Sequence, residues 1–151
     1  MRGDNGCLAP HIRSFFDDYL VCRCNVSINT IRSYRDGVKM FLSYAADTQH
    51  KAPAKLLVAD VAEPVVLGFL QHLESTRTNS IQTRNHRLAI LRSLFAYISR
   101  REPLLLDQCR KVLTIPLKRR SHRPQIGYLE KAELSALFDA TDRSTTQGRR
   151  D

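Results

Sequence analysis

The clearest structural signal in this chain is the segment SIQTRNHRLAILRSLFAYI, residues 80–98. Its apolar side chains recur every three or four positions, which is the period of an α-helix that buries one face. Ser80 suits the start of such a helix, because its hydroxyl accepts a hydrogen bond from a backbone N–H of the first turn. The apolar positions are Ile81, Leu88, Leu91, Leu94, Phe95 and Ile98. A long helix with one buried face predicts a helical bundle.

The remaining positions of the same segment are basic or polar. They include Arg84, Arg87 and Arg92, with Asn85 beside them, and the segment has no acidic residue. We expect these side chains to point outward and to form a basic helix face. Surface arginines are often only a solvated face, so this feature alone leaves nucleic-acid binding and an ordinary surface equally open.

Three further amphipathic segments precede this helix. The first follows Pro10 and ends near Asn25, and the second is capped by Ser27 or Asn29. Asp60 is predicted to cap the third, since its carboxylate can accept backbone hydrogen bonds at a helix start. Their apolar positions include Ile12, Phe15, Phe16, Tyr19, Leu20, Ile31, Val38, Phe41, Leu42, Val66, Phe69, Leu70 and Leu73. The sequence has no alternating strand pattern, so the predicted fold is all-α, with four main helices in a bundle.

A basic linker is predicted after these helices. Residues 104–113 predict a short fifth helix, and residues 115–125 follow it with the sequence IPLKRRSHRPQ, which is bounded by prolines. Residues 128–140 again have an apolar face and predict the isolated first helix of another domain. The basic residues of the linker are Lys118, Arg119, Arg120, His122 and Arg123, a cluster suited to phosphate groups. The predicted organisation is a helical domain (10–115), a linker (116–127) and the start of a second domain (128–151).

The charge of the chain favours a polyanionic partner. The formal net charge is +9, and between Arg77 and Arg123 the chain has twelve Lys or Arg residues but only two acids. Because the charge is concentrated in the fourth helix and the linker, nucleic acid is the favoured partner. The alternative is a helical protein-interaction module whose basic surface binds an acidic protein.

Several other classes of function are excluded by what the sequence lacks. It has no apolar run of roughly 18 to 20 residues that could span a membrane and no signal-like start, so a cytoplasmic protein is expected. It has no metal-ligand cluster and no glycine-rich phosphate loop, so we expect no metal, no cofactor and no small-molecule substrate. The four cysteines are interpreted as free thiols: Cys7, Cys22, Cys24 and Cys109.

Two stretches resemble the core-binding domain of tyrosine recombinases of the phage integrase type. SINTIRSYRDGVKMFLSYA, residues 27–45, is similar to the second helix of that domain, and residues 80–98 are similar to its fourth. The matching residues are Ser27, Asn29, Thr30, Tyr34, Arg35, Phe41 and Leu42 in the first stretch, and Thr83, Asn85, Arg87, Leu88, Leu91, Arg92, Phe95 and Tyr97 in the second. Residues 128–140 resemble the opening helix of the catalytic domain. The resemblance therefore extends over residues 11–140, nearly the whole chain.

This resemblance implies a four-helix, SAM-like domain that grips double-stranded DNA, with its second and fourth helices facing the major groove. Other recombinase protomers on the same DNA are a further candidate partner. The DNA-binding residues that it implies, together with the cations of the linker, are Thr30, Tyr34, Arg35, Arg84, Asn85, Arg87, Arg92, Lys118, Arg119, Arg120 and Arg123. Tyr34 and Leu88 also lie on apolar stripes, where we interpret them as core residues.

Catalysis is not expected from the residues that carry the resemblance. In this family, a tyrosine nucleophile cleaves the strand, and arginine, lysine and histidine or tryptophan side chains stabilise the charge that develops on the phosphate. The resemblance places all of these residues after the segment matched here. We therefore expect this chain to bind DNA without recombining it.

Overall fold

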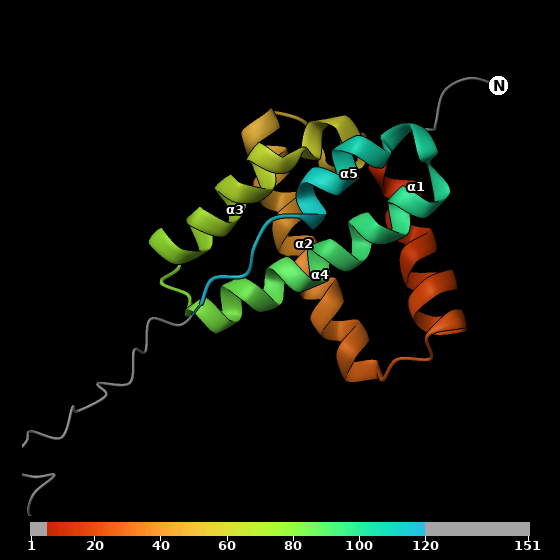
Figure 1. Ribbon diagram of the computed structural model, residues 1–151, viewed down its shortest axis with the longest axis horizontal. Coiled ribbons are helices and arrows are strands. Elements are labelled where there is room, and N and C mark those ends of the chain that lie inside the picture. The colour runs from red at the N-terminus through yellow and green to blue at the C-terminus, as the bar shows by residue number, and fades with distance from the viewer. Residues whose placement is uncertain (1–5, 120–151) are drawn as a thin grey trace, which may run out of the picture. The chain divides into compact units, whose positions relative to one another are not determined.

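The computed structural model describes residues 6–119, and their regular structure is helical apart from one isolated bridge between Cys7 and Leu57 (Figure 1). In chain order the elements are α1 (Leu8–Ser14), the π-helix η1 (Phe15–Arg23), α2 (Ile28–Gln49), the 3-10 helices η2 (Pro53–Lys55) and η3 (Val58–Val61), α3 (Glu63–Ser75), α4 (Ile81–Arg101), the 3-10 helix η4 (Pro103–Leu105) and α5 (Leu106–Leu113). The all-α prediction is confirmed. The helix expected at residues 128–140 lies outside the described residues.

Serine caps start the two longest helices, as predicted. The Oγ of Ser27 accepts a hydrogen bond of 3.2 Å from the backbone N–H of Thr30, which decides between the two caps considered for α2. The Oγ of Ser80 accepts an equivalent bond of 3.2 Å from the N–H of Thr83 at the start of α4. Each cap satisfies one of the backbone donors that a helix start leaves without a partner.

The prediction that Asp60 caps the third helix is wrong. Helix α3 begins at Glu63, and Ala62 occupies the cap position. The carboxylate of Asp60 instead accepts bonds of 2.7 and 2.8 Å from Lys51 Nζ and one of 2.9 Å from the N–H of Leu57. The hydrogen bond from Lys51 is the main reason why the pKa of Asp60 is lowered. Asp60 therefore ties the end of α2 to η3.

The predicted first helix is divided into two parts. It begins as α1 and continues as the π-helix η1, before the chain turns at Asn25, which has a φ of 46°. Phe15 lies at the junction and is fully buried. Its ring stacks on Tyr19 with centroids 5.6 Å apart and lies 5.5 Å from the ring of Tyr97 in α4. This aromatic cluster fixes η1 against the bundle.

The core lies between α2, α3 and α4, and α5 covers α3 and α4 (Figure 1). Phe41 of α2 meets Phe69 of α3 edge to face at 5.3 Å, and both are fully buried. Burial of each such side chain contributes roughly 1.5–3 kcal/mol. Gly37 lies where α2 crosses α4, since a Cβ added to it would come within 2.9 Å of Cδ1 of Ile90. Glycine at this position therefore permits the close approach of the two helices.

Candidate nucleic-acid interface

Helix α4 has one face that is accessible along its length. Its residues are exposed or half-buried and are spaced by three or four positions, so they form a single strip. The strip consists of Gln82, His86, Ala89, Ser93 and Ala96. A shallow hollow at its N-terminal half is lined in part by Gln82, His86, Ala89 and the neighbouring Arg87. Small and polar side chains on this strip allow another molecule to approach the helix closely.

Arg84 does not point outward as expected. It is 6% exposed, and its Nε lies 3.8 Å from Oε1 of Glu74 at the end of α3. Its NH1 donates hydrogen bonds to Oδ1 of Asn85 at 3.0 Å and to the carbonyl of Pro116 at 3.4 Å. The physical reason is helical register, because Arg84 precedes the buried Leu88 by four positions and so lies on the buried face of α4.

Asn85 is held by the chain that leaves α5. Its Nδ2 donates a hydrogen bond of 2.7 Å to the carbonyl of Lys118, and the N–H of Lys118 donates one of 3.0 Å back to its Oδ1. The ammonium of Lys118 also donates to Oε2 of Glu74 at 2.6 Å. Both residues were expected at a DNA surface, and the structure joins them to each other.

Arg87 lies at the crossing of α2 and α4. It is half-buried, and its NH1 donates a hydrogen bond of 3.4 Å to the carbonyl of Ser33. Next to it, Nε2 of His86 is 2.9 Å from Oγ of the same serine. Arg92 is also half-buried and lies about 140° around the helix from Arg87, since each residue turns an α-helix by about 100°. Neither arginine has a carboxylate partner within residues 6–119.

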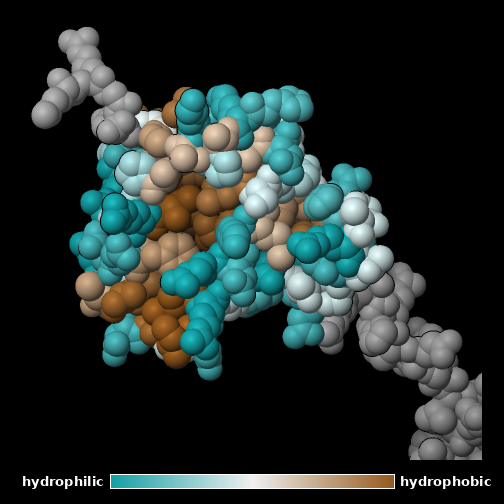
Figure 2. All heavy atoms as spheres, turned by 180° about the vertical axis from the view of Figure 1, so that it is seen from behind, coloured by the Kyte–Doolittle hydropathy of each residue, from teal (hydrophilic) through white to brown (hydrophobic). Residues whose placement is uncertain are grey.

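The candidates on α2 do not share one surface. Thr30 lies in its first turn, where its Oγ1 is 2.9 Å from Oγ of Ser27. Tyr34 packs against the core, with its hydroxyl 3.3 Å from Oγ of Ser93 in α4, in agreement with its interpretation as a core residue. Arg35 is exposed and lines a groove beside Ile12 of α1. The back of the molecule has an apolar area bordered by hydrophilic side chains (Figure 2).

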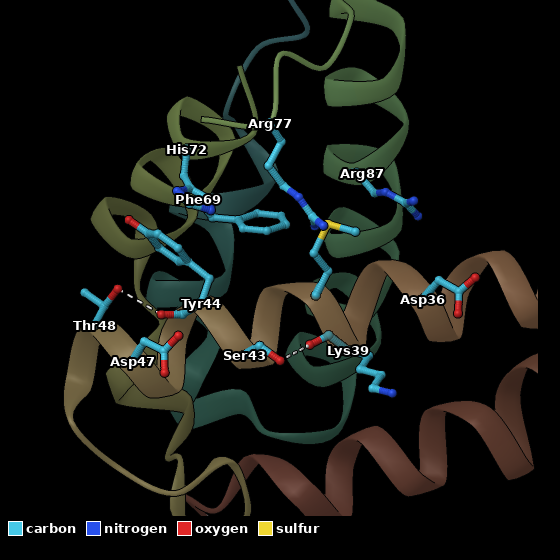
Figure 3. Close-up of a pocket in the computed structure, with 11 residues that line it drawn as sticks. Asp36, Lys39, Ser43, Tyr44, Asp47, Thr48, Phe69, His72, Arg77 and Arg87 are labelled. Carbon is cyan, nitrogen blue, oxygen red and sulfur yellow. Dashed lines mark hydrogen bonds between the residues drawn. The ribbon is translucent and has the colours of Figure 1, made fainter. Parts of the chain in front are cut away.

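Sequence reasoning missed a larger hollow of about 800 Å³ between α2, α3 and α4 (Figure 3). Tyr44 and His72 lie side by side at one end of it, with ring centroids 5.3 Å apart, and Arg77 reaches over it from the α3–α4 loop. Lys39 and Asp36 line the same hollow, so its charge is mixed. The sequence offered no signal for it, because its residues come from three helices and the loop between two of them.

Residues 6–119 contain no group of three or more potential metal ligands and no helix long and apolar enough to cross a membrane. All four cysteines are free, and burial raises the pKa of the Cys109 thiol. Of the linker candidates, Arg119 is exposed, whereas Arg120 and Arg123 lie outside the described residues.

Comparison with known proteins gives a consistent result. The family model described as "Phage integrase, N-terminal SAM-like domain" matches residues 14–102, more than half of the chain. Two proteins of Sinorhizobium fredii (strain NBRC 101917 / NGR234), both named as candidate integrases/recombinases, are similar over 144 residues, or 95% of this chain. The protein y4rD is 40% identical, with 51% of its length covered, and y4rC is 38% identical, with 43% covered. The chain thus spans about half the length of these relatives. No solved structure matches.

Proposed function

Because this chain belongs to the phage integrase N-terminal SAM-like domain family, we propose that its helical domain binds duplex DNA for a site-specific recombinase. The names of both relatives contain the words integrase and recombinase, which supports this role. The proposal concerns binding alone and assigns no catalytic role to residues 6–119. In this role the protein acts in the cytoplasm, on the nucleoid, and residues 116–127 serve as an interdomain linker.

The observation that carries the proposal is the accessible strip of α4. The major groove of DNA admits an α-helix, and small side chains on the strip let the helix axis come close to the base edges. Arg92 borders the strip on one side, whereas Arg87 lies farther around the helix, half-buried at the crossing with α2. Neither has a carboxylate partner in the described part of the chain. Arg92 can therefore contact a phosphate at the edge of a groove, and Arg87 can do so after its NH1 leaves the carbonyl of Ser33.

Other candidates take supporting places in this proposal. Thr30 lies three positions before Ser33, which contacts His86 and Arg87 of α4, and can add a contact from the start of α2. Arg119, and further along Arg120 and Arg123, can follow the backbone beyond the groove. Lys118 can do so only after it leaves Glu74, which holds its ammonium at 2.6 Å. Arg35 lines the groove beside α1, which is a surface separate from the accessible strip of α4. Any contact that Arg35 makes with DNA therefore belongs to that second surface.

The test is the salt dependence of binding to a random DNA duplex. The wild-type chain should bind tightly at low salt and lose affinity steeply as salt rises, because phosphate contacts release counterions. Replacing both Arg87 and Arg92 with glutamine, which keeps much of the side-chain length, should reduce the log–log slope by about 1.8, or about 0.9 per contact. Thermal melts should establish that the variant is folded.

A matched control removes two positive charges from another helix. Arg110→Gln with Lys111→Gln alters exposed cations of α5 and should leave the slope nearly unchanged. An equal loss in both double variants would mean that only net charge matters and would reject the α4 strip. A wild-type chain that does not bind duplex DNA at low salt would reject DNA binding itself and would favour the acidic-protein alternative.

A further inference from the structure

The chain that leaves α5 returns to the start of α4 instead of extending directly into solvent (Figure 1). Ile115 is 3% exposed and anchors this return in the core. The N–H of Ile115 donates a hydrogen bond of 3.2 Å to the carbonyl of Val112, so the segment starts from a defined turn. Residues 116–118 then run beside the first turns of α4, where Arg84 and Asn85 contact them.

The contact with Asn85 recognises the backbone of the outgoing segment. Its side-chain amide donates to the carbonyl of Lys118 and accepts from the N–H of the same residue, at 2.7 and 3.0 Å. A pair of hydrogen bonds to one residue fixes both its position and the orientation of its peptide groups. Only a side chain with a donor and an acceptor can form this pair, so asparagine fits and aspartate would lose the donor.

Glu74 reinforces this contact through charge. Its carboxylate lies 2.6 Å from Lys118 Nζ and 3.8 Å from Arg84 Nε, so one acid serves two cations. Arg84 in turn donates to the carbonyl of Pro116 at 3.4 Å. Three side chains from the end of α3 and the start of α4 therefore hold both ends of the segment 116–118.

We propose that Glu74, Arg84 and Asn85 form a latch that fixes the point and the direction in which the chain leaves the helical domain. Residues 116–118 are then held in a defined place relative to α4. Asn85 acts in this scheme as a positioning residue, and its amide is engaged by the protein's own backbone. The latch does not depend on DNA binding and can be tested without DNA.

The experiment is limited proteolysis of the full chain with a lysine-specific endoproteinase, followed by mass spectrometry. Cleavage after Lys118 requires its side chain and backbone to leave the latch, whereas cleavage after Lys111 requires α5 to unfold. The wild-type chain should be cut after Lys118 at least about ten times more slowly than a free peptide of residues 112–125, since the latch contributes several hydrogen bonds.

The variants separate the parts of the latch. Asn85→Ala removes both hydrogen bonds to Lys118, together with the one from Arg84, and should raise the rate of cleavage after Lys118 by about tenfold, with cleavage after Lys111 unchanged. Asn85→Asp and Glu74→Gln each remove part of the contact and should give smaller increases. His86→Ala is the matched control, because His86 is adjacent on α4 but bonds to Ser33 and should leave the cleavage after Lys118 unchanged.

Two outcomes would overturn the latch. One is a wild-type chain that is cut after Lys118 as fast as the free peptide. The other is an Asn85→Ala variant that is cut there at the wild-type rate. If Asn85→Ala also increases cleavage after Lys111, the domain itself has loosened, and the Glu74→Gln variant then decides. An increase in its cleavage rate that is confined to Lys118 supports the latch. No increase in its cleavage after Lys118 rejects the latch.

Discussion

Replacement of Arg84 with alanine should destabilise the helical domain by about 2 kcal/mol, since hydrogen bonds that involve a charged group contribute roughly 1.5–3 kcal/mol. The side chain is 6% exposed and makes its contacts with Glu74, Asn85 and Pro116. The contacts with Glu74 and Pro116 are long, at 3.8 and 3.4 Å, and Glu74 would keep its bond to Lys118. These two facts place the expected value toward the lower end of that range. Loss of packing around the aliphatic part of the side chain adds to it.

The assay is thermal unfolding followed by circular dichroism. A loss of about 2 kcal/mol should lower the Tm by about 8 °C in a domain of this size. Arg84→Met should cost less than Arg84→Ala, because a methionine fills much of the space that an alanine would leave empty. Arg92→Ala is the control, and its Tm should fall little, since Arg92 has no carboxylate partner in the described part of the chain.

Two results would refute this reasoning. One is an Arg84→Ala variant with the Tm of the wild-type chain, and the other is an Arg92→Ala variant that loses as much stability as Arg84→Ala. The prediction also bears on DNA binding. At a temperature where Arg84→Ala is fully folded, its affinity for duplex DNA should lie close to that of the wild type, because Arg84 is not accessible to a phosphate.

Two more changes test how α2 is held. The pKa of Asp60 is lowered below 3.8 in the folded chain, so its contribution to stability is present above that value and is lost as the pH falls through the folded pKa. Urea unfolding should therefore show that Asp60→Asn is less stable than the wild type at neutral pH. This difference in stability should disappear in strong acid. A difference that stays constant with pH would contradict the role given to the Asp60 carboxylate. Gly37→Ala should destabilise the chain by about 1 kcal/mol in urea unfolding, because overpacking against Ile90 exceeds the gain in helix propensity of about 1 kcal/mol. Ile90→Val removes the Cδ1 that the new Cβ would meet, so the double variant should be less destabilised than the sum of the single changes, and simple additivity would place the clash elsewhere.

The helices and their starts could be predicted because their signals are local. The period of the apolar residues in α4 and the serine caps at Ser27 and Ser80 depend only on neighbouring residues. Asp60 shows the limit of this approach. Its local sequence resembles a cap, but its carboxylate is engaged by Lys51, nine positions away, and by the N–H of Leu57. Local patterns describe what a side chain can accept but not which donor the folded chain brings to it.

The prediction that Arg84 points outward could have been avoided from the sequence alone. The residues four, seven and eleven positions after it are Leu88, Leu91 and Phe95, all of them buried, so the helical period already places Arg84 on the buried face. Its partners could not be foreseen, because Glu74 belongs to α3 and Pro116 to the chain after α5. The role of Asn85 was hidden for the same reason.

The position of the acids decides how much of the positive charge is left for a ligand. The chain has 24 Lys and Arg residues against 15 acids, but formal charge does not show which cations are already engaged. At the two ends of α4, Arg84 is paired with Glu74, and Arg101 lies 3.9 Å from Asp18 and over the ring of Tyr97. Between these ends, Arg87 and Arg92 have no carboxylate partner in the described part of the chain, and α4 itself contains no acid. Arg84 and Arg101 therefore serve the fold, and in the proposed function it is Arg87 and Arg92 that supply charge to a phosphate backbone.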